Sequence, residues 1–335
     1  MLDYVVETIH SNLLQGNVLG DPADRNLVVH LPPGYRESTR RYPTVYHLHG
    51  FGGCALASTL DFTTNAGPRW RCFRDMAEES IRGGRSAEMI HVFPDGANRW
   101  GCSQWVGNDV QGDYDRYVAE EVVHLVDGRY RTIPSPEGRG LVGASSGGIG
   151  AFNIGARHPE VFGALAVQCA DIYMEVSHVA WLVKFLNACQ PDGPNGPLPG
   201  NTWSWFAYGL AAAYSPNRDN PPFYVDLPMV YPTGELIPAV WDRWLPYDPI
   251  RAVYTFAENL RRYRGIYLDV GFRDEHDLHL GHRILSKRMT ELGVAHQNHE
   301  HDGTHGSRAT ERLELIHQWF STVLRGSRGD EAMRR

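Results

Sequence analysis

Residues 141–150 read LVGASSGGIG, the apolar end of a predicted strand followed by two serines between glycines. The stretch GASSG at 143–147 matches Gly-x-Ser-x-Gly, in which a serine sits on a sharp turn from a strand into a helix. Glycines flank the serine because side chains would clash in so tight a turn. Centring the motif on Ser146 gives poorer flanks, so Ser145 is the predicted nucleophile. The alternative is a glycine-rich turn without catalysis.

A serine hydroxyl is a weak nucleophile and needs a base, which in turn needs an orienting acid. On a strand-turn-helix motif of this kind the chain order is serine, acid, histidine, so the base should lie near the C-terminus. The stretch HQNHEHDGTHGS at 296–307 offers His296, His299, His301 and His305. The first three lie on a predicted strand at 295–300 or at its end. His305 lies beyond it in a glycine-flanked loop and is the predicted base, with His301 second.

The acid should follow the predicted strand 266–270, where GFRDEHDL at 271–278 supplies Asp274, Glu275 and Asp277. Asp274 lies in the first turn after that strand and is the predicted acid. Asp277 is the second choice, because it is better placed to cap a helix that begins near Leu278.

An ester-cleaving site must also stabilise the oxyanion of a tetrahedral intermediate with N–H donors held in place beforehand. One donor is expected to be the amide after the nucleophile, that of Ser146. The other is expected from the loop HGFGG at 49–53, whose glycines let the backbone approach a substrate closely. Phe51 is the predicted second donor, with Gly52 as the alternative.

Short β-rich apolar runs alternate with helical periodicity along most of the chain, which indicates a mostly parallel sheet with helices on both faces. The predicted strands lie at 26–31, 44–49, 89–93, 141–142, 164–168, 266–270 and 295–300. The predicted helices lie at 72–81, 113–130, 147–157, 278–292 and 310–324, with Asp113 as a predicted N-cap.

Residues 171–264 break this alternation with tryptophans, tyrosines and proline- and glycine-rich clusters. We interpret them as an aromatic insertion that forms a lid or pocket wall at the carboxyl edge of the sheet, where open α/β sheets bind ligands. Trp203 and Trp205 are its candidate substrate-pocket residues. Residues 1–170 and 265–325 then form the core, and residues 326–335 are expected to be a disordered tail.

Several stretches together resemble the putative-esterase family of α/β-hydrolases. They are HLHGFGG (47–53), VFPDG (92–96), DYDRYVAEEVVHLVDGRYRTIP (113–134), RGLVGASSGGIGAFNIGARHPEVFGAL (139–165), GFRDEHDL (271–278) and HDGTHGS (301–307). The family includes S-formylglutathione hydrolase (esterase D), feruloyl and acetyl-xylan esterases, enterochelin esterase and the mycolyltransferases. The resemblance covers residues 25–170 and 265–322.

The resemblance implies an α/β-hydrolase fold and a Ser-Asp-His ester hydrolase or acyltransferase that needs no cofactor. By motif it assigns the triad to Ser145, Asp274 and His305, and the oxyanion donors to Phe51 and Ser146. The insertion departs from the compact members of the family, and the cysteine-containing oxyanion loop of the formylglutathione hydrolases is missing, so that activity is not favoured. We expect a serine esterase of medium-sized uncharged or aromatic esters. The alternative is an acyltransferase with a non-water acceptor.

Composition excludes several other classes. The net charge is −7, so neither nucleic acid nor an anionic membrane surface is an expected partner. No apolar run is long enough to span a membrane, and the first residues do not resemble a signal peptide. The five cysteines show no CxxC and are expected to be free thiols. These features favour a cytoplasmic protein with a small-molecule ester substrate, and self-association is left open.

Two other classes of protein compete with the esterase. A zinc hydrolase is suggested by His276, His279 and His282, but their three-residue spacing on a helix spreads the outer two by about 120°. No metal is therefore expected. A non-catalytic binding module should lack a triad member, and none is missing.

Overall fold

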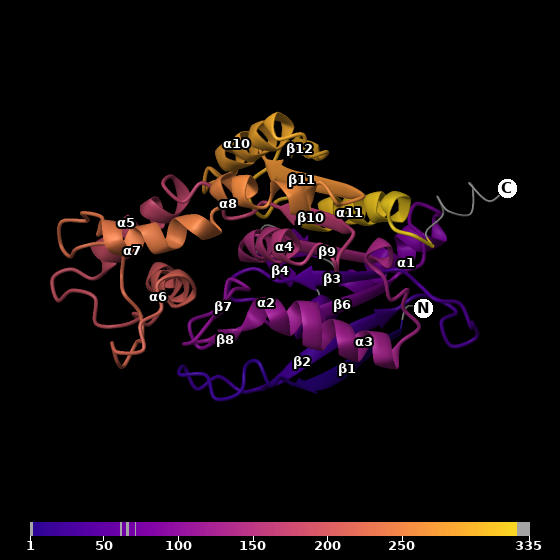
Figure 1. The fold of residues 1–335 in the computed structure, drawn as a ribbon, viewed down its shortest axis with the longest axis horizontal. Helices are drawn as coiled ribbons and strands as arrows, with labels where there is room; N and C mark the ends of the chain where they lie inside the picture. Colours follow the sequence, from indigo (N-terminus) through magenta and orange to yellow (C-terminus); the bar gives the residue numbers. More distant parts are fainter. Residues whose placement is uncertain (1–2, 61, 65–66, 71, 327–335) are drawn as a thin grey trace.

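The computed structural model of the chain describes residues 3–60, 62–64, 67–70 and 72–326. At its centre is an eight-stranded sheet in the order β1-β2-β6-β3-β9-β10-β11-β12 (Figure 1). Its strands are β1 (Asp3–His10), β2 (Asp24–Leu31), β3 (Thr44–Leu48), β6 (Ile90–Pro94), β9 (Arg139–Ala144), β10 (Ala164–Gln168), β11 (Gly265–Gly271) and β12 (Gln297–His301). β2 is antiparallel to both neighbours, and the strands from β6 to β12 are parallel. This is the predicted α/β-hydrolase sheet.

Two short hairpins lie outside that sheet. They are β4 (Phe62–Thr64) with β5 (Gly67–Trp70) and β7 (Gly107–Asn108) with β8 (Gly112–Asp113).

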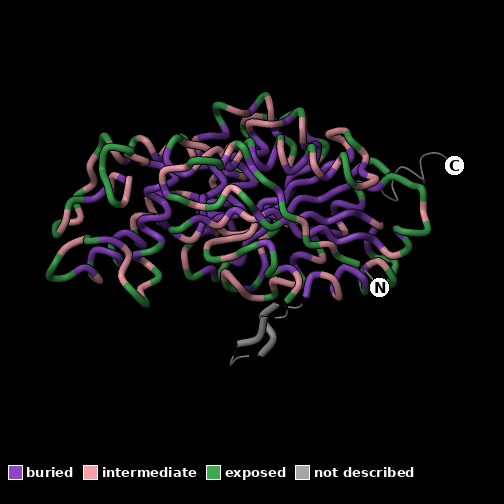
Figure 2. Tube along the Cα trace, turned by 90° about the horizontal axis from the view of Figure 1, so that it is seen from below, coloured by how far each residue is buried: buried purple, intermediate pink, exposed green. Residues whose placement is uncertain are grey.

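The central strands are buried along almost their whole length because both faces of the sheet are covered. Every residue of β3 and β10 is buried, as expected of parallel strands packed between two helical layers. Figure 2 shows the buried residues concentrated through the middle of the molecule, with exposed residues at its margins.

The helices form a layer on each face of the sheet. They are α1 (Phe73–Arg82), α2 (Tyr114–Arg116), the π-helical stretch η2 (Tyr117–Val122), α3 (Val123–Arg129), α4 (Ser146–Arg157), α8 (Pro249–Thr255), α9 (Ala257–Leu260), α10 (Leu278–Glu291) and α11 (Ala309–Val323). Short 3-10 turns are η1 (Ala55–Thr59), η3 (Pro136–Gly138) and η4 (Leu245–Tyr247). α1 packs against α11, whereas α4 packs against α8 and α9, and α10 packs against α8. The helices α4, α8, α9 and α10 pack into one apolar cluster of the core, whereas α1 and α11 pack into two others.

Three local features differ from the sequence prediction. β1 was not predicted because it is an edge strand whose residues are mostly exposed or half-buried, so it lacks an apolar signature. Asp113 and Asp277 precede α2 and α10 as predicted, but neither side chain caps its helix. Asp113 instead pairs with Arg116, and Asp277 adopts a left-handed backbone conformation (φ 58°).

Residues 171–248 form a helical subassembly at one end of the long axis of the molecule. Its helices α5 (Ser177–Ala188), α6 (Thr202–Tyr214) and α7 (Pro238–Trp244) lie together at the left of Figure 1 and share one apolar cluster, which extends into the core through residues such as Trp100 and Ile149. The carboxylate of Asp248 accepts hydrogen bonds from the amides of Tyr173 (3.1 Å) and Met174 (3.0 Å), and so joins the two ends of this segment. The rest of the predicted insertion, α8 and α9, packs against the core helix α4.

Four buried histidines gather beneath α1 and α11. They are His30 on β2, His47 on β3, His91 on β6 and His317 on α11. The Phe73 ring lies 4.9–5.2 Å from all four imidazoles. His47 and His91 share a hydrogen bond of 3.1 Å, and the rings of His91 and His317 stack at 4.5 Å.

Two further predictions concern thiols and membranes. None of the five cysteines is in a disulfide, and only Cys54 is exposed. No helix in the described ranges combines the length and apolar character that crossing a bilayer would require. Apart from Gly326, the predicted tail at 326–335 lies outside the described residues.

Candidate active site

Ser145 occupies the sharp turn between β9 and α4. Its backbone is left-handed (φ 58°, ψ −125°), a conformation that non-glycine residues adopt rarely and that stores strain at functional sites. A Cβ on Gly143 would overlap the carbonyl of Gly147, and one on Gly147 would overlap the carbonyl of Leu48. Both glycines are therefore required by close backbone packing, which explains the motif.

The predicted base and acid are connected to Ser145 by consecutive hydrogen bonds. His305, on the loop between β12 and α11, has its Nε2 3.1 Å from Ser145 Oγ. Its Nδ1 lies 2.9 Å from Oδ2 of Asp274, which is on the turn after β11. The other oxygen of Asp274 accepts the amide N–H of His276 at 2.9 Å, and Glu275 accepts the amide N–H of His305 at 2.8 Å. The loop that carries the imidazole is thus tied to the turn that carries the acid.

The second choices of the sequence analysis do not reach the nucleophile. His301 is buried at the end of β12, and neither of its ring nitrogens has a hydrogen-bond partner among the described residues. Asp277 contacts Asp274 only through the backbone, with its amide 3.0 Å from the Asp274 carbonyl.

The electrostatics of the pair suit proton transfer. Burial opposes protonation of His305, but the hydrogen bond and charge of Asp274, together with the charge of Asp171, raise its pKa above 6.5. Burial also opposes ionisation of Asp274, but its hydrogen bond to His305 and the charge of that imidazole lower its pKa below the ordinary value. Asp274 therefore stays ionised while His305 changes its charge.

The glycine-rich loop at 49–53 lies directly against the turn of the nucleophile. A Cβ on Gly50 would come within 3.2 Å of both the Ala144 carbonyl and Ser145 Cβ. The amide of Gly52 donates to the carbonyl of Gly101 at 3.2 Å, so it is engaged within the protein. Ser146 is the first residue of α4, and the amide at such a position has no intrahelical acceptor.

The VFPDG stretch supports this loop from behind. Asp95 accepts the amide of Ala97 at 2.9 Å, which organises the turn as expected for an Asp-Gly pair. The amide of Gly96 donates to His49 Nε2 at 2.9 Å, and the Trp105 indole donates to the His49 carbonyl at 3.0 Å.

An aromatic wall connects the insertion to the imidazole. The Phe206 ring of α6 lies 4.5 Å from that of Phe51 and 4.7 Å from that of Trp181. The wall continues from Trp181 to His276 at 5.4 Å and from His276 to His305 at 5.0 Å.

The two tryptophans predicted for the pocket lie at different distances from this wall. Trp203 reaches it through a contact of 6.1 Å with the ring of His276. Trp205 is 37% exposed, and its ring lies 6.1 Å from that of Trp100. Sequence reasoning did not single out Phe206, because nothing in the pattern of α6 shows which of its residues faces the nucleophile.

One charged residue beside Ser145 was also missed. Asp171 follows β10, is 1% exposed, and accepts a hydrogen bond from Ser145 Oγ at 3.3 Å. A signal for it existed in the sequence, because Asp171 comes three residues after a mostly apolar strand, β10. That strand pairs in parallel with β9, the strand that leads to Ser145.

The histidines weighed as zinc ligands do not form a cluster. Nε2 of His282 accepts the amide of Ala170 at 3.0 Å and is therefore occupied. Among the described histidine, cysteine and acidic side chains, the only group with ligand atoms within 4.8 Å of one another is His47, His91 and His317. The rings of His91 and His317 are stacked nearly parallel. An imidazole binds a metal with a lone pair that lies in the plane of its ring, and one ion cannot lie in the planes of two stacked rings. The arrangement therefore does not fit a single metal ion.

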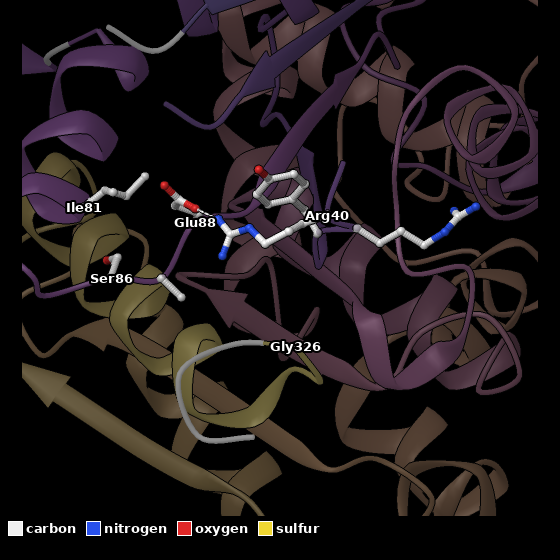
Figure 3. Close-up of a pocket in the computed structure, with 8 residues that line it drawn as sticks. Arg40, Ile81, Ser86, Glu88 and Gly326 are labelled. Carbon is white, nitrogen blue, oxygen red and sulfur yellow. Dashed lines mark hydrogen bonds and ion pairs between the residues drawn. The ribbon is translucent and has the colours of Figure 1, made fainter. Parts of the chain in front are cut away.

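A separate cavity of about 320 Å³ lies at the amino-terminal edge of the sheet, where the chain enters β3 and β6 (Figure 3). Arg40 and Glu88 form an ion pair across it, and Tyr42 and Gly326 contribute to its lining. Because Ser145 lies at the other ends of these parallel strands, this cavity is not part of the candidate active site.

Comparisons with known proteins identify the family of the chain. The sequence model of the family described as Putative esterase matches residues 21–318. Over 133 residues the chain is 28% identical to Esterase Rv1288 of Mycobacterium tuberculosis, an alignment that spans 38% of this chain and only 25% of that protein.

The fold is shared with several solved structures. A ferulic acid esterase aligns with a TM-score of 0.63 at 19% identity, covering 97% of this chain and 99% of its own. An S-formylglutathione hydrolase (FrmB) from Staphylococcus aureus aligns with a TM-score of 0.61 at 14% identity, covering 96% and 99%. Since the family model spans most of the sequence, the chain belongs to the putative esterase family of α/β-hydrolases.

Proposed function

We propose that the protein is a serine esterase that cleaves carboxylic esters through an acyl-enzyme, with Ser145, His305 and Asp274 as its triad. The observation that carries this proposal is the continuous hydrogen-bonded chain from Ser145 Oγ through His305 to Asp274. Such a chain activates a hydroxyl that is otherwise a weak nucleophile.

In this mechanism Ser145 Oγ attacks the ester carbonyl while its proton moves to His305 Nε2. Asp274 holds the imidazole by Nδ1 and stabilises the imidazolium that forms. The imidazolium then protonates the departing alcohol, which leaves the acyl group on Ser145. Water, deprotonated by the now neutral His305, attacks the acyl-enzyme. The imidazolium then returns this proton to Ser145 Oγ as the acid leaves, which restores the starting state.

The amides of Phe51 and Ser146 are the proposed donors to the oxyanion. The engagement of the Gly52 amide with Gly101 supports Phe51 over Gly52. The position of Ser146 at the start of α4 supports the other donor, because the positive end of the helix dipole favours negative charge there.

The substrate is proposed to be a medium-sized uncharged or aromatic ester. Support comes from the aromatic wall of Phe51, Phe206, Trp181 and Trp203, whose rings offer stacking surface beside the nucleophile. The exposed position of Trp205 suits the outer end of such a pocket better than its base.

A fluorophosphonate probe tests the triad directly. Wild-type protein and the Ser146→Ala variant should form a covalent adduct that maps to Ser145, while the Ser145→Ala variant should form none and lose turnover by several orders of magnitude. His305→Ala should abolish the burst of alcohol release, and His301→Ala should retain it. Labelling that persists in Ser145→Ala and disappears in Ser146→Ala would move the nucleophile to Ser146.

The acyl acceptor is tested separately by product analysis. With an aromatic ester in water the expected product is the free acid. A new ester as the main product, when a dilute alcohol is supplied, would identify an acyltransferase that uses the same triad.

A further inference from the structure

A second carboxyl group touches the proposed nucleophile. Oδ1 of Asp171 accepts from Ser145 Oγ at 3.3 Å, while Oδ2 accepts from Ser146 Oγ at 2.9 Å. Ser146 Oγ in turn accepts from the amide nitrogen of Gln104 at 3.1 Å. Asp171 is thus fixed in place on one side and in contact with the reacting oxygen on the other.

This carboxyl group is buried without a basic partner. Within the described part of the chain, Asp171 forms no ion pair with an arginine or lysine, and its exposure is 1%. The titratable groups that face it are His305 and Asp274, whose charges act on it in opposite directions, with Tyr214 and Cys102 nearby. Burial raises the pKa of Asp171 to about 6, so the group changes its charge close to neutral pH.

The geometry gives the single Ser145 proton two competing acceptors. His305 Nε2 lies 3.1 Å from Oγ, and Asp171 Oδ1 lies 3.3 Å from the same atom. Only donation to His305 leads to attack. An ionised Asp171 therefore stabilises the resting hydroxyl in an unproductive hydrogen bond, since hydrogen bonds to charged acceptors are the stronger ones.

Acylation removes the donor on which this contact depends. Oγ becomes an ester oxygen without a proton, so an ionised Oδ1 would face only lone pairs in a buried site, which is unfavourable. A protonated Asp171 could instead donate to that ester oxygen. The balance is complete when the Ser145 proton leaves with the alcohol through His305 and Asp171 takes one further proton from water.

We propose, resting on the triad proposed above, that Asp171 is an ionisable restraint on the nucleophile, which holds the Ser145 hydroxyl when charged and takes up a proton when the acyl-enzyme forms. Asp171→Asn keeps the shape of the side chain, cannot ionise, and can donate an N–H to Oγ. It therefore imitates the protonated state at every pH.

The test compares second-order acylation rate constants of Asp171→Asn and wild type, measured with a fluorophosphonate probe from acid to alkaline pH. The variant-to-wild-type ratio should be close to one at acid pH, where wild-type Asp171 is protonated, and should rise about tenfold or more by pH 8, the amount that loss of one charge-assisted hydrogen bond allows. Asp171→Asn also removes a charge that raises the pKa of His305. That effect leaves more neutral imidazole in the variant only over the pH range in which His305 titrates, and it disappears at higher pH, where the imidazole is neutral in both proteins. A ratio that stays high at the alkaline end therefore reports the lost hydrogen bond to Ser145 and not the change at His305.

A matched control comes from the insertion. Asp248 is another fully buried aspartate, but its hydrogen bonds go to the amides of Tyr173 and Met174 and not to Ser145. Asp248→Asn should lower the melting temperature and leave the shape of the pH profile unchanged. A ratio for Asp171→Asn that is the same at every pH, or that falls as pH rises, would overturn the proposal and leave Asp171 a structural residue.

A second measurement covers the case in which Asp171→Asn does not fold. Difference infrared spectra of the wild type at pH 7.5, before and after phosphonylation, should gain a protonated-carboxyl band, and the absence of that band would contradict proton uptake. Ser145→Ala distinguishes the two proposals. If Ser145→Ala still reacts at the wild-type rate, the triad itself is wrong. If Ser145→Ala is unreactive and the rate ratio of Asp171→Asn to wild type does not change with pH, only the role of Asp171 is rejected.

Discussion

The four buried histidines around Phe73 should make the stability of the protein fall steeply in acid. Burial lowers the pKa of His30 and His317 to about 3 and that of His47 and His91 well below 6.5. In the unfolded chain each imidazole takes up a proton near pH 6.5, whereas in the folded protein it stays neutral. The unfolded state therefore binds more protons below pH 6.5, and the free energy of unfolding decreases as the pH falls.

The magnitude follows from the number of groups. Each imidazole that is kept neutral lowers the free energy of unfolding by about 1.4 kcal/mol per pH unit below 6.5. Four of them lower it by about 5 kcal/mol per pH unit. These four alone would unfold a domain stable by about 5–15 kcal/mol at about one to three pH units below 6.5. Burial also lowers the pKa of His178 and His282 to about 3, so these two add to the slope of the wild type.

Urea unfolding followed by tryptophan fluorescence, at several pH values between about 7.5 and 5.5, measures this slope. His317→Leu removes one of the four groups and should make the slope shallower by about 1.4 kcal/mol per pH unit. His10→Gln is the control, because exposed His10 pairs with Asp24 and has a raised pKa, so both states are already protonated below pH 6.5. If His317→Leu and wild type share one slope, the imidazoles are not held neutral and the reasoning fails.

Three further predictions concern the site and its supports. Asp274→Asn should lower turnover by about 10⁴-fold, as in the serine protease triad, and should shift the acid limb of the profile of kcat/KM to lower pH. The limb of the wild type should lie above pH 6.5, because Asp274 raises the pKa of His305 and catalysis needs the neutral imidazole; a limb that Asp274→Asn does not move would contradict this. Gly147→Ala should lower both melting temperature and activity, since its Cβ would overlap the Leu48 carbonyl, whereas Gly128→Ala has open space and should leave activity unchanged. Phe206→Ala and Trp203→Ala should raise KM for aromatic esters more than for p-nitrophenyl acetate, and Trp205→Ala should do so less; an equal loss on all substrates with a lower melting temperature would mark these rings as packing residues.

The elements that the sequence predicts well are those whose signal is local. The turn at Ser145 is identifiable because its glycines are required by backbone contacts within a few residues. The positions of Asp274 and His305 follow from the fixed order of parallel strands, since the carboxyl ends of β9 and β11 must meet at one edge of the sheet. The hydrogen-bonded chain that links them has the predicted members, while their catalytic role stays a prediction.

The features that were missed depend on contacts between distant segments. Asp171 touches Ser145 only because β10 lies beside β9, and its burial beside a second serine has no counterpart in a motif. Phe206 reaches Phe51 across 155 positions of the chain, because α6 folds back over the glycine-rich loop at 49–53. β1 escaped prediction for the opposite reason, since a half-exposed edge strand has too little apolar character to stand out.

The hydrogen bonds of Asp248 have a consequence for how far the segment between Tyr173 and Asp248 can vary. By binding the amides of Tyr173 and Met174 it closes residues 173–248 into a loop whose two ends meet at one point of the sheet edge. The entropy of closing such a loop grows slowly with its length, by only about 0.6 kcal/mol for each doubling. Insertions, deletions or replacements between these two ends should therefore cost little free energy. If the proposed function is correct, changes in this segment would alter the rings near an ester substrate, while the strands that lead to Ser145, Asp274 and His305 keep their register.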